Sequence, residues 1–204
     1  MKTKYALVNG SAKRLGKDIA LQLTEQGYTV LFHYFTSNKE ITELKKYFLK
    51  INKPFFAFKA DIKDKKQIKK MAQWIKENFG KLDLLVNNVG NYKLANISEY
   101  SVEDWDDTIQ SNLNGACYCI HYLLDLIKKS KGNIINIGYA NVDSIQASVN
   151  STAYSISKTG LLILTKSLAK DLGKDNVRVN MISPGHQENS IDLPKNYKKE
   201  IPLQ

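Results

Sequence analysis

The sequence predicts an α/β protein in which a doubly wound parallel sheet lies between two layers of helices. Short apolar runs of strand type alternate with longer segments in which apolar residues recur at helical spacing, without internal repeats or a proline-rich linker. The chain has 204 residues, of which 43% are hydrophobic. That length suffices for one substantial core and is short for two, so we expect a single domain over residues 1–204.

The first predicted elements are a strand at residues 4–9, a turn that carries glycine, and a helix. Gly10 and Gly16 bracket the turn, and apolar residues lie four apart in the helix, which Gly27 ends. A strand, a glycine turn and a helix in this order direct backbone N–H groups at a pyrophosphate. Arg14 stands where the middle glycine of a three-glycine fingerprint is expected. We therefore predict a Rossmann-type unit that binds a dinucleotide.

Five further strands follow, with helical segments between them. They are predicted at residues 28–34, 54–59, 82–86, 133–137 and 177–182. One helix is marked by an apolar stripe made of Ile68, Met71, Ala72, Ile75 and Phe79. Another is predicted to begin at Ser101, because Asp104 completes a capping box with Asp in place of Glu. A parallel sheet of this kind binds ligands at the carboxyl ends of its strands.

The last predicted helix runs from Tyr154 to about residue 172 and begins with a tyrosine and a lysine four residues apart. At that spacing Tyr154 and Lys158 project from one face, so the ammonium group can lie near the phenol. A free tyrosine has a pKa of roughly 10, and a neighbouring positive charge favours the phenolate. The pair is therefore a candidate proton donor or acceptor. Taken alone, the spacing favours a chance pair on a solvated helix. The predicted dinucleotide-binding turn at Gly10 supports a catalytic pair instead.

The charge and hydropathy of the chain limit its partners and location. The net charge is +10, yet only Arg14 and Arg178 are arginines, whereas proteins that read bases rely on arginine. We expect a lysine-rich solvated surface and no nucleic-acid partner. No apolar run approaches the roughly 18 residues of a membrane span, and the chain enters a strand without a signal-peptide core. We expect a cytoplasmic protein with no membrane partner.

The cysteines and histidines predict neither a redox pair nor a metal site. Cys117 and Cys119 are two residues apart, so on a helix they point in different directions, and we expect both to be buried, reduced thiols. The three histidines, His33, His121 and His186, lack the spacing of metal ligands, so no metal site is predicted.

From Met1 to about Gly185 the chain resembles the short-chain dehydrogenase/reductase family. Besides the glycine turn and the Tyr154–Lys158 pair, the resemblance rests on Asp61 after the third strand, NNVG at residues 87–90, Asn112, and NMISPG at residues 180–185. It implies a domain that binds a nicotinamide cofactor and transfers hydride to or from a carbonyl or imine. The implied cofactor contacts outside the glycine turn are Asp61, Ile62, Asn88, Val89, Gly90, Tyr154, Lys158, Pro184 and Gly185.

The resemblance also implies a role for the residues near the reacting atoms. Tyr154 would give a proton to the substrate oxygen as hydride arrives, and Lys158 would hold the ribose and favour the phenolate. Asn112 would bind a water that links Lys158 to solvent. A polar residue in an otherwise apolar helix can equally be a packing amide or an oligomer contact, so the sequence leaves these alternatives open for Asn112.

The end of the second strand favours NADP(H) over NAD(H). NAD-specific sites place an acid there to bind the ribose 2′-hydroxyl, and that carboxylate would repel a 2′-phosphate. Here the strand ends without an acid. The turn GSAKRLG looks most like the pteridine reductase branch of the family, although that branch has a further basic residue where Phe35 and Thr36 stand. The predicted contacts at this end of the cofactor are Gly10, Lys13, Arg14, Leu15, Gly16, His33, Tyr34 and Ser37.

The fifth strand lacks the serine, or in pteridine reductases the aspartate, that family members place just after it to bind the substrate oxygen. Tyr139 follows Gly138 at the end of this strand, fifteen residues before Tyr154. The segment between them is longer than usual, so the Tyr139 hydroxyl, Asp143 or Ser144 are candidates for that role. Asp143 and Ser144 are equally compatible with polar loop residues that cap the turn.

Two function classes follow from these residues. In the first, the protein is an NADPH-dependent reductase of a carbonyl or imine, with a pterin-like, 3-oxoacyl or small ketone substrate. In the second, it binds dinucleotide with little or no catalysis, as a structural or regulatory subunit. The presence of Asn112, Tyr154 and Lys158 together favours the enzyme, because a chain without catalysis has no chemical need for all three.

Family members continue past the PG sequence through a further helix and a seventh strand, whereas this sequence stops at Gln204. We expect a C-terminally incomplete chain, or a partner that covers the edge of the sixth strand. The resemblance implies a homo-oligomer, either a tetramer or a dimer. The polar residues from His186 to Asn189 are candidates for recognition of the substrate.

Overall fold

The computed structural model describes residues 3–185, which form a six-stranded sheet in the order β3-β2-β1-β4-β5-β6. All neighbouring strands are parallel. The strands are β1 (Lys4–Val8), β2 (Tyr28–Tyr34), β3 (Phe56–Lys59), β4 (Leu84–Asn87), β5 (Asn133–Ile137) and β6 (Arg178–Ile182). Because the strand order reverses between β1 and β4, the crevice for a ligand lies at the carboxyl ends of these two strands.

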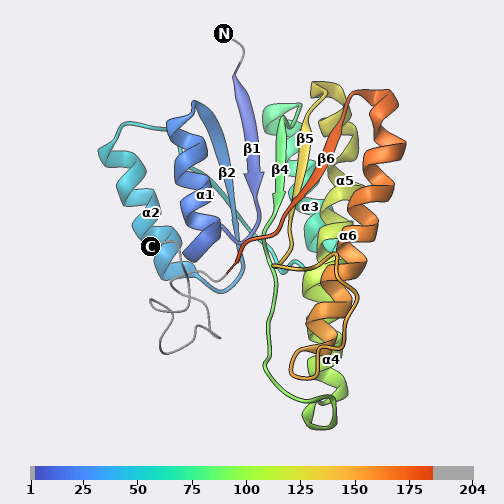
Figure 1. The fold of residues 1–204 in the computed structure, drawn as a ribbon. Coiled ribbons are helices and arrows are strands. Elements are labelled where there is room, and N and C mark those ends of the chain that lie inside the picture. Colours follow the sequence, from blue (N-terminus) through green and yellow to red (C-terminus); the bar gives the residue numbers. More distant parts are fainter. Residues whose placement is uncertain (1–2, 186–204) are drawn as a thin grey trace.

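Helices cover both faces of the sheet, which confirms the predicted three-layer fold (Figure 1). One face carries α1 (Arg14–Glu25) and α2 (Asn38–Lys50), and the other carries α3 (Lys65–Phe79), α5 (Gly115–Ser130) and α6 (Thr152–Leu172). The short helix α4 (Val102–Ile109) lies beyond the carboxyl ends of the strands (Figure 1). A π-helical turn, Gln110–Asn114, joins α4 to α5, and short 3₁₀ turns occur at Ile97–Glu99 and Gly173–Asp175.

Two apolar cores form because side chains of a strand alternate between the faces of the sheet. In β1, Ala6 and Val8 pack toward α1 and α2, whereas Leu7 packs toward α3 and α5, and all three are fully buried. On the first face, the ring of Phe32 meets that of Phe48 edge to face, with ring centroids 5.3 Å apart. Every strand that borders the ligand crevice is therefore held from both sides.

The predicted elements are all present in the described residues; the strands at 28–34 and 133–137 have the predicted boundaries, and the boundaries of the other strands are shifted. The predicted strand at 54–59 begins at Phe56, because Pro54 has no N–H to donate to the ladder. The last helix begins at Thr152, two residues before Tyr154. The capping box at Ser101 and Asp104 is confirmed. The strands predicted at 4–9, 82–86 and 177–182 are found at Lys4–Val8, Leu84–Asn87 and Arg178–Ile182.

One prediction about the thiols is wrong. Cys119 is buried in the core, but Cys117 is exposed. The two cysteines are two positions apart on α5, so their side chains point in directions that differ by more than half a turn of the helix. Both are free cysteines. Between residues 3 and 185, no helix is long and apolar enough to cross a membrane.

Candidate active site

The glycine turn between β1 and α1 is closely packed against the turn that follows β4. Gly10 has a φ of +65°, which favours glycine, and a Cβ added there would lie 2.8 Å from a methyl carbon of Val89. A Cβ on Gly16 would lie 2.3 Å from the carbonyl oxygen of Gly10 and 2.5 Å from Nδ2 of Asn88. The amide of Asn88 donates to the carbonyl oxygens of Asn9 (3.1 Å) and Gly10 (3.3 Å). Two loops predicted to contact the cofactor therefore form one rigid surface.

The start of α1 is arranged to receive an anion. Lys13 occupies the N-cap position with no side-chain capping bond, and the first turn of the helix contains no acidic residue. The side chains of Lys13 and Arg14 are exposed there, whereas Leu15 is half-buried. Arg14 has a φ of 51°, in the left-handed region, at the position where the sequence led us to expect glycine.

His33 lies beneath the glycine turn and uses both ring nitrogens inside the protein. Its Nδ1 accepts from the N–H of Gly10 (3.1 Å), so Nε2 carries the proton and donates to the carbonyl oxygen of Ala60 (3.0 Å). Burial lowers the pKa of His33 to about 4, which keeps the ring neutral. The structure thus places His33 as a support for the turn, with no ring nitrogen left for the ribose that we expected it to contact. Tyr34 and Ser37 remain half-buried beyond it, and the end of β2 carries no acid.

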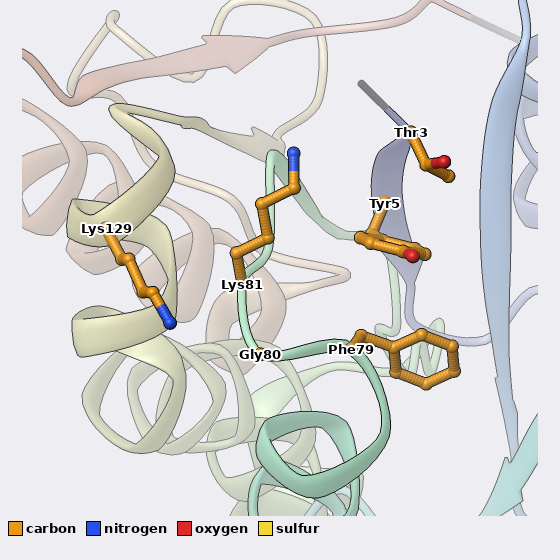
Figure 2. Close-up of a pocket in the computed structure, with 6 residues that line it drawn as sticks. All are labelled: Thr3, Tyr5, Phe79, Gly80, Lys81 and Lys129. Atoms are coloured by element: carbon orange, nitrogen blue, oxygen red, sulfur yellow. The ribbon is translucent and has the colours of Figure 1, made fainter. Parts of the chain in front are cut away.

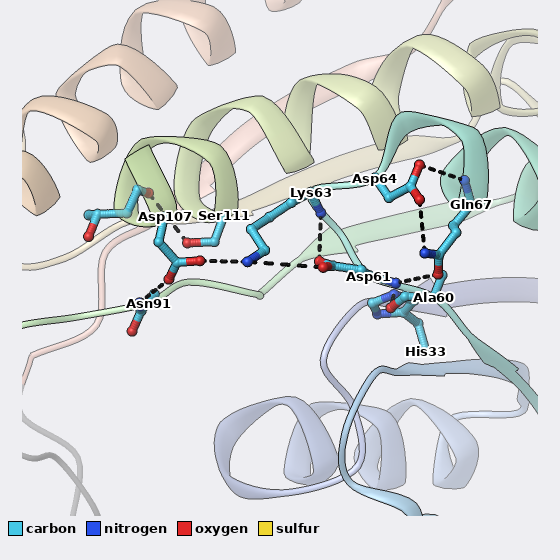
Figure 3. A network of polar contacts seen from close by, with 10 residues as sticks. His33, Ala60, Asp61, Lys63, Asp64, Gln67, Asn91, Asp107 and Ser111 are labelled. Carbon is cyan, nitrogen blue, oxygen red and sulfur yellow. Dashed lines mark hydrogen bonds and ion pairs between the residues drawn. The ribbon is translucent and has the colours of Figure 1, made fainter. Parts of the chain in front are cut away.

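The residues after β3 are tied to α4 by a chain of polar contacts, which Figure 3 shows. The side chain of Asp61 accepts from the backbone N–H of Lys63 (3.0 Å), and the Lys63 ammonium pairs with Asp107 on α4 (2.6 Å). Asp107 in turn accepts from the side-chain amide of Asn91. Ile62 packs against Gly115, where a Cβ would lie 2.7 Å from it. The implied cofactor contact Asp61 is therefore linked through Lys63 and Asp107 to the turn after β4, and Ile62, the other contact implied there, packs beside it against α5.

Tyr154 and Lys158 lie together on α6, as their spacing predicts. The Lys158 nitrogen is 5.7 Å from the centre of the Tyr154 ring and donates to the carbonyl oxygen of Ile137 (2.7 Å). Only 3% of Lys158 is exposed, and burial lowers its pKa to about 8. Tyr154 is half-buried at the start of the helix. A buried cation beside a phenol at the ligand edge of the sheet is suited to proton transfer.

Asn112 occupies the π-helical turn and directs an unsatisfied oxygen toward Lys158. Its amide donates to the carbonyl oxygens of Asn91 (2.7 Å) and Thr108 (2.9 Å), while its buried Oδ1 has no hydrogen-bond partner among the described residues. A Cβ added at Gly90 would lie 2.4 Å from that oxygen and 3.3 Å from the Lys158 nitrogen. The two polar atoms thus both lie beside Gly90, and a buried acceptor of this kind needs a donor such as water.

Two further tyrosines surround the ring of Tyr154. Tyr92 meets it edge to face at a centroid distance of 4.9 Å, and Tyr139 lies at 5.5 Å. Tyr139 stands directly after Gly138, where the family serine is expected. Asp143 and Ser144 are exposed in the turn that follows. The structure therefore brings one of the three candidate partners, Tyr139, next to Tyr154.

Pro184 and Gly185, two of the implied cofactor contacts, follow β6 at the same edge of the sheet. The candidates for substrate recognition from His186 to Asn189 lie outside the described residues. In the part of the chain that is described, no group of three or more potential metal ligands occurs.

A hollow at the opposite end of the molecule lacks such chemistry. Figure 2 shows that it is lined by Thr3, Tyr5, Phe79, Gly80, Lys81 and Lys129. These residues lie around the amino end of β1, and the Lys81 ammonium is paired with Asp83 (2.9 Å). The candidate active site is therefore the carboxyl edge of the sheet, where Tyr154, Lys158 and Asn112 converge.

Comparisons with known proteins agree with this fold and identify the family. The sequence pattern of the short chain dehydrogenase family matches residues 4–199. The 3-oxoacyl-[acyl-carrier-protein] reductase FabG of Staphylococcus aureus is 33% identical over 184 residues, which cover 90% of this chain and 74% of that protein. An uncharacterized oxidoreductase of Staphylococcus epidermidis is 31% identical over 195 residues, which cover 95% of this chain and 80% of that protein.

A solved structure of a related protein has the same fold. A dehydrogenase/reductase from Sinorhizobium meliloti 1021 superposes with a TM-score of 0.87 at 28% identity, over 98% of this chain and 79% of that one. The fold, the family match and these relatives together define an oxidoreductase that depends on a nicotinamide dinucleotide. The chain belongs to the short-chain dehydrogenase/reductase family, as its motifs led us to expect.

Sequence reasoning missed several residues that support the site. Tyr92 follows the NNVG turn closely, but nothing local indicates that its ring reaches Tyr154. Asn9 and Asn136 are buried amides at the end of one strand and within another, and Thr165 is a buried hydroxyl on α6. A polar side chain in an apolar run is a signal that could have marked all three.

Proposed function

We propose that this protein is an NADPH-dependent reductase of a carbonyl or imine, with Tyr154 as the proton donor. The observation that carries the proposal is the convergence of Tyr154, the buried Lys158 ammonium and the unsatisfied Asn112 oxygen at the ligand edge of the sheet. These groups make a proton path from solvent to a substrate atom.

The residues present fit a nicotinamide dinucleotide. The first backbone N–H groups of α1 receive no side-chain cap and are suited to a pyrophosphate, and Asn88, Val89 and Gly90 lie beside the glycine turn. Asp61 and Ile62 would hold the adenine, and Pro184 and Gly185 would lie against the nicotinamide. When bound, the cofactor supplies the hydride that reduces the substrate carbon.

Each catalytic side chain has one part in the reaction. The O–H bond of Tyr154 breaks and its proton goes to the substrate oxygen or nitrogen, which gains negative charge as the carbon is reduced. The Lys158 cation stabilises the phenolate that remains. A water on Asn112 Oδ1 would then return a proton to Tyr154 by way of Lys158, so the enzyme ends the cycle as it began it.

The preference for NADPH over NADH is supported by charge. Arg14 and Lys13 place two exposed cations at the start of α1, and the end of β2 carries no acid that would repel a 2′-phosphate. Tyr34 and Ser37 add hydroxyl groups at the same end of the cofactor.

In this proposal, the hydroxyl of Tyr139 takes the place of the usual serine and forms the hydrogen bond to the substrate oxygen. Its ring and that of Tyr92 flank Tyr154, so the substrate atom that takes the proton lies between aromatic faces. Among the substrates considered, such walls favour a flat, pterin-like ring, because planar rings stack on aromatic faces. The name of the Staphylococcus aureus relative supports a 3-oxoacyl substrate instead, so both belong in the test panel.

The test is NADPH oxidation by the purified protein against a panel of dihydropterins, 3-oxoacyl thioesters and small ketones. We expect turnover with at least one member, and a loss of about 10²- to 10⁴-fold in Tyr154→Phe with NADPH binding unchanged. Tight NADPH binding without turnover on the panel would favour the second function class, a dinucleotide-binding protein with little or no catalysis.

A further inference from the structure

Four buried polar side chains form a row of hydrogen bonds beneath the candidate active site. Asn9 donates to Asn87 (2.7 Å), Asn87 donates to Asn136 (2.8 Å), and Asn136 donates to the hydroxyl of Thr165 (2.8 Å). None is more than 4% exposed. The row begins at the end of β1, crosses β4 and β5, which are neighbours in the sheet, and ends on α6.

The orientation of the Asn9 side-chain amide determines which atom donates and which accepts in every other hydrogen bond of the row. The Oδ1 of Asn9 accepts from the backbone N–H groups of Asn88 and Val89, each at 2.7 Å, so its amide nitrogen must face Asn87. Each amide then accepts on one side and donates on the other, and the Thr165 hydroxyl completes the row by donating to the carbonyl oxygen of Leu161 (2.7 Å). The row thus links the turn that lines the cofactor crevice to the helix of Tyr154.

Two polar contacts one residue apart on β5 hold α6 in place. Thr165 receives the amide of Asn136, and Lys158 donates to the carbonyl oxygen of the next residue, Ile137. Lys158 and Thr165 are seven positions apart, so they lie on the same face of the helix, two turns from each other. Apolar contacts allow a helix to slide, whereas a buried hydrogen bond is satisfied in one register only.

We propose that Asn136 and Thr165 are positioning residues, whose hydrogen bond sets the register of α6 on β5 and thereby places Lys158 and Tyr154 against the Asn88–Gly90 turn. Neither side chain touches the reacting atoms. The inference rests on the proposed function for its consequence in turnover, since a shift of about 1 Å in such a group can cost about 10²-fold in rate. Its structural part concerns the surroundings of Lys158 and can be measured without any substrate.

The first experiment compares Thr165→Val, which keeps the shape and removes the hydroxyl, with Thr165→Ser, which restores it. We expect Thr165→Val to lower kcat about tenfold or more while the KM for NADPH stays the same, and Thr165→Ser to recover most of the rate. If the valine variant does not fold, Thr165→Cys replaces it in this experiment, because cysteine has a similar volume to threonine and its sulfur is only a weak acceptor for the Asn136 amide.

The matched control is Thr24→Val. Thr24 is buried on α1, and its hydroxyl also donates to a carbonyl four residues earlier, that of Ala20 (2.8 Å), but it lies on the other face of the sheet. We expect a similar loss of stability in this variant and no change in kcat. Equal effects of Thr165→Val and Thr24→Val on kcat would overturn the proposal.

The second experiment follows the titration of Lys158 by NMR of protein labelled at the lysine side chains, with Lys158→Met to assign the signal. The pKa of Lys158 should be about 8 in the unmodified protein and in Thr24→Val, and should move toward its ordinary value of 10.5 in Thr165→Val, because a displaced ammonium meets more water. An unchanged titration in a folded Thr165→Val protein contradicts the inference. Absence of turnover in the unmodified protein counts against the proposed function alone, since the titration still reports on register.

Discussion

At the scale of single residues, burial decides which titratable groups keep a charge. Lys158 is buried yet has a carbonyl acceptor and a phenol beside it, so it can be a cation in the working range of an enzyme. His33 is equally buried, but its two hydrogen bonds require one donor and one acceptor nitrogen, which only the neutral ring provides. The protein therefore holds a charged base on α6 beside Tyr154 and a neutral base on β2 beneath the glycine turn.

His33 should make the protein sensitive to acid. The unfolded ring takes up a proton near pH 6.5, whereas the folded ring does so only near its pKa of about 4. Stability is therefore unaffected above pH 6.5 and falls as pH decreases from 6.5 to 4, by about 3 kcal/mol in all. Urea unfolding at several pH values should show a smaller decrease in His33→Asn than in the unmodified protein. Equal slopes over this range would show that the ring is not held neutral.

Arg14 combines a strained backbone with a useful charge. Its φ of 51° costs a residue other than glycine roughly 1–2 kcal/mol, so Arg14→Gly should keep or raise the melting temperature. The same change removes a cation from the phosphate end of the site, and we expect the preference for NADPH over NADH to fall about tenfold. Titration with both cofactors measures this ratio. A preference that is unchanged in Arg14→Gly and lowered in Lys13→Gln would assign the recognition to Lys13.

At the scale of elements, the order and type of strands and helices follow from local patterns, but the contacts between loops do not. The glycine turn, the capping box at Ser101 and the apolar stripe of α3 are each visible within a few residues of sequence. The π-helical turn that carries Asn112 is not visible in this way, and in the structure this turn and α4 both contact α6, which lies far away in the sequence. Asn112 lies within one continuous helical stretch, as the sequence indicates, but in a π-helical turn that the sequence does not reveal.

The packing of α1 against the turn after β4 gives a prediction for both cofactors. A Cβ on Gly16 would lie 2.3 Å from the Gly10 carbonyl oxygen and must displace the start of α1. Gly16→Ala should therefore weaken NADPH and NADH binding by similar factors, each about tenfold or more. Gly173→Ala is the control, because a Cβ there meets nothing within 4 Å and the backbone is helical. Unchanged cofactor binding in Gly16→Ala would mean that the close approach is not needed.

At the scale of the whole molecule, one side of α6 faces the active site and the other side leaves large apolar residues uncovered. Ile156 and Ile163 are seven positions apart, hence on one face of the helix, and are 48% and 63% exposed. The tetramer or dimer that we propose from the family resemblance would cover this face, which would add support to the helix that carries Tyr154 and Lys158.

This surface gives the prediction for assembly. Light scattering on the eluting protein should give a mass above that of one chain, and Ile163→Glu should lower it, because a carboxylate buried between two copies is costly. Ile163→Val keeps an apolar surface and should leave the mass unchanged. A protein that runs as a single chain, or an assembly that tolerates Ile163→Glu, would contradict this use of α6.

The sequence by itself determined the fold class, the family, the position of the glycine turn and the pairing of Tyr154 with Lys158, because these depend on periodicity, on spacings within one element, or on the order of short motifs along the chain. Only the tertiary structure decided that Lys158 is buried against Ile137, that His33 supports the turn from beneath, and that Tyr92 and Tyr139 surround Tyr154. It also joined Asn136 to Thr165. These relations link residues far apart in the chain, and their energies depend on burial and partners that exist only once the sheet and its helices have assembled.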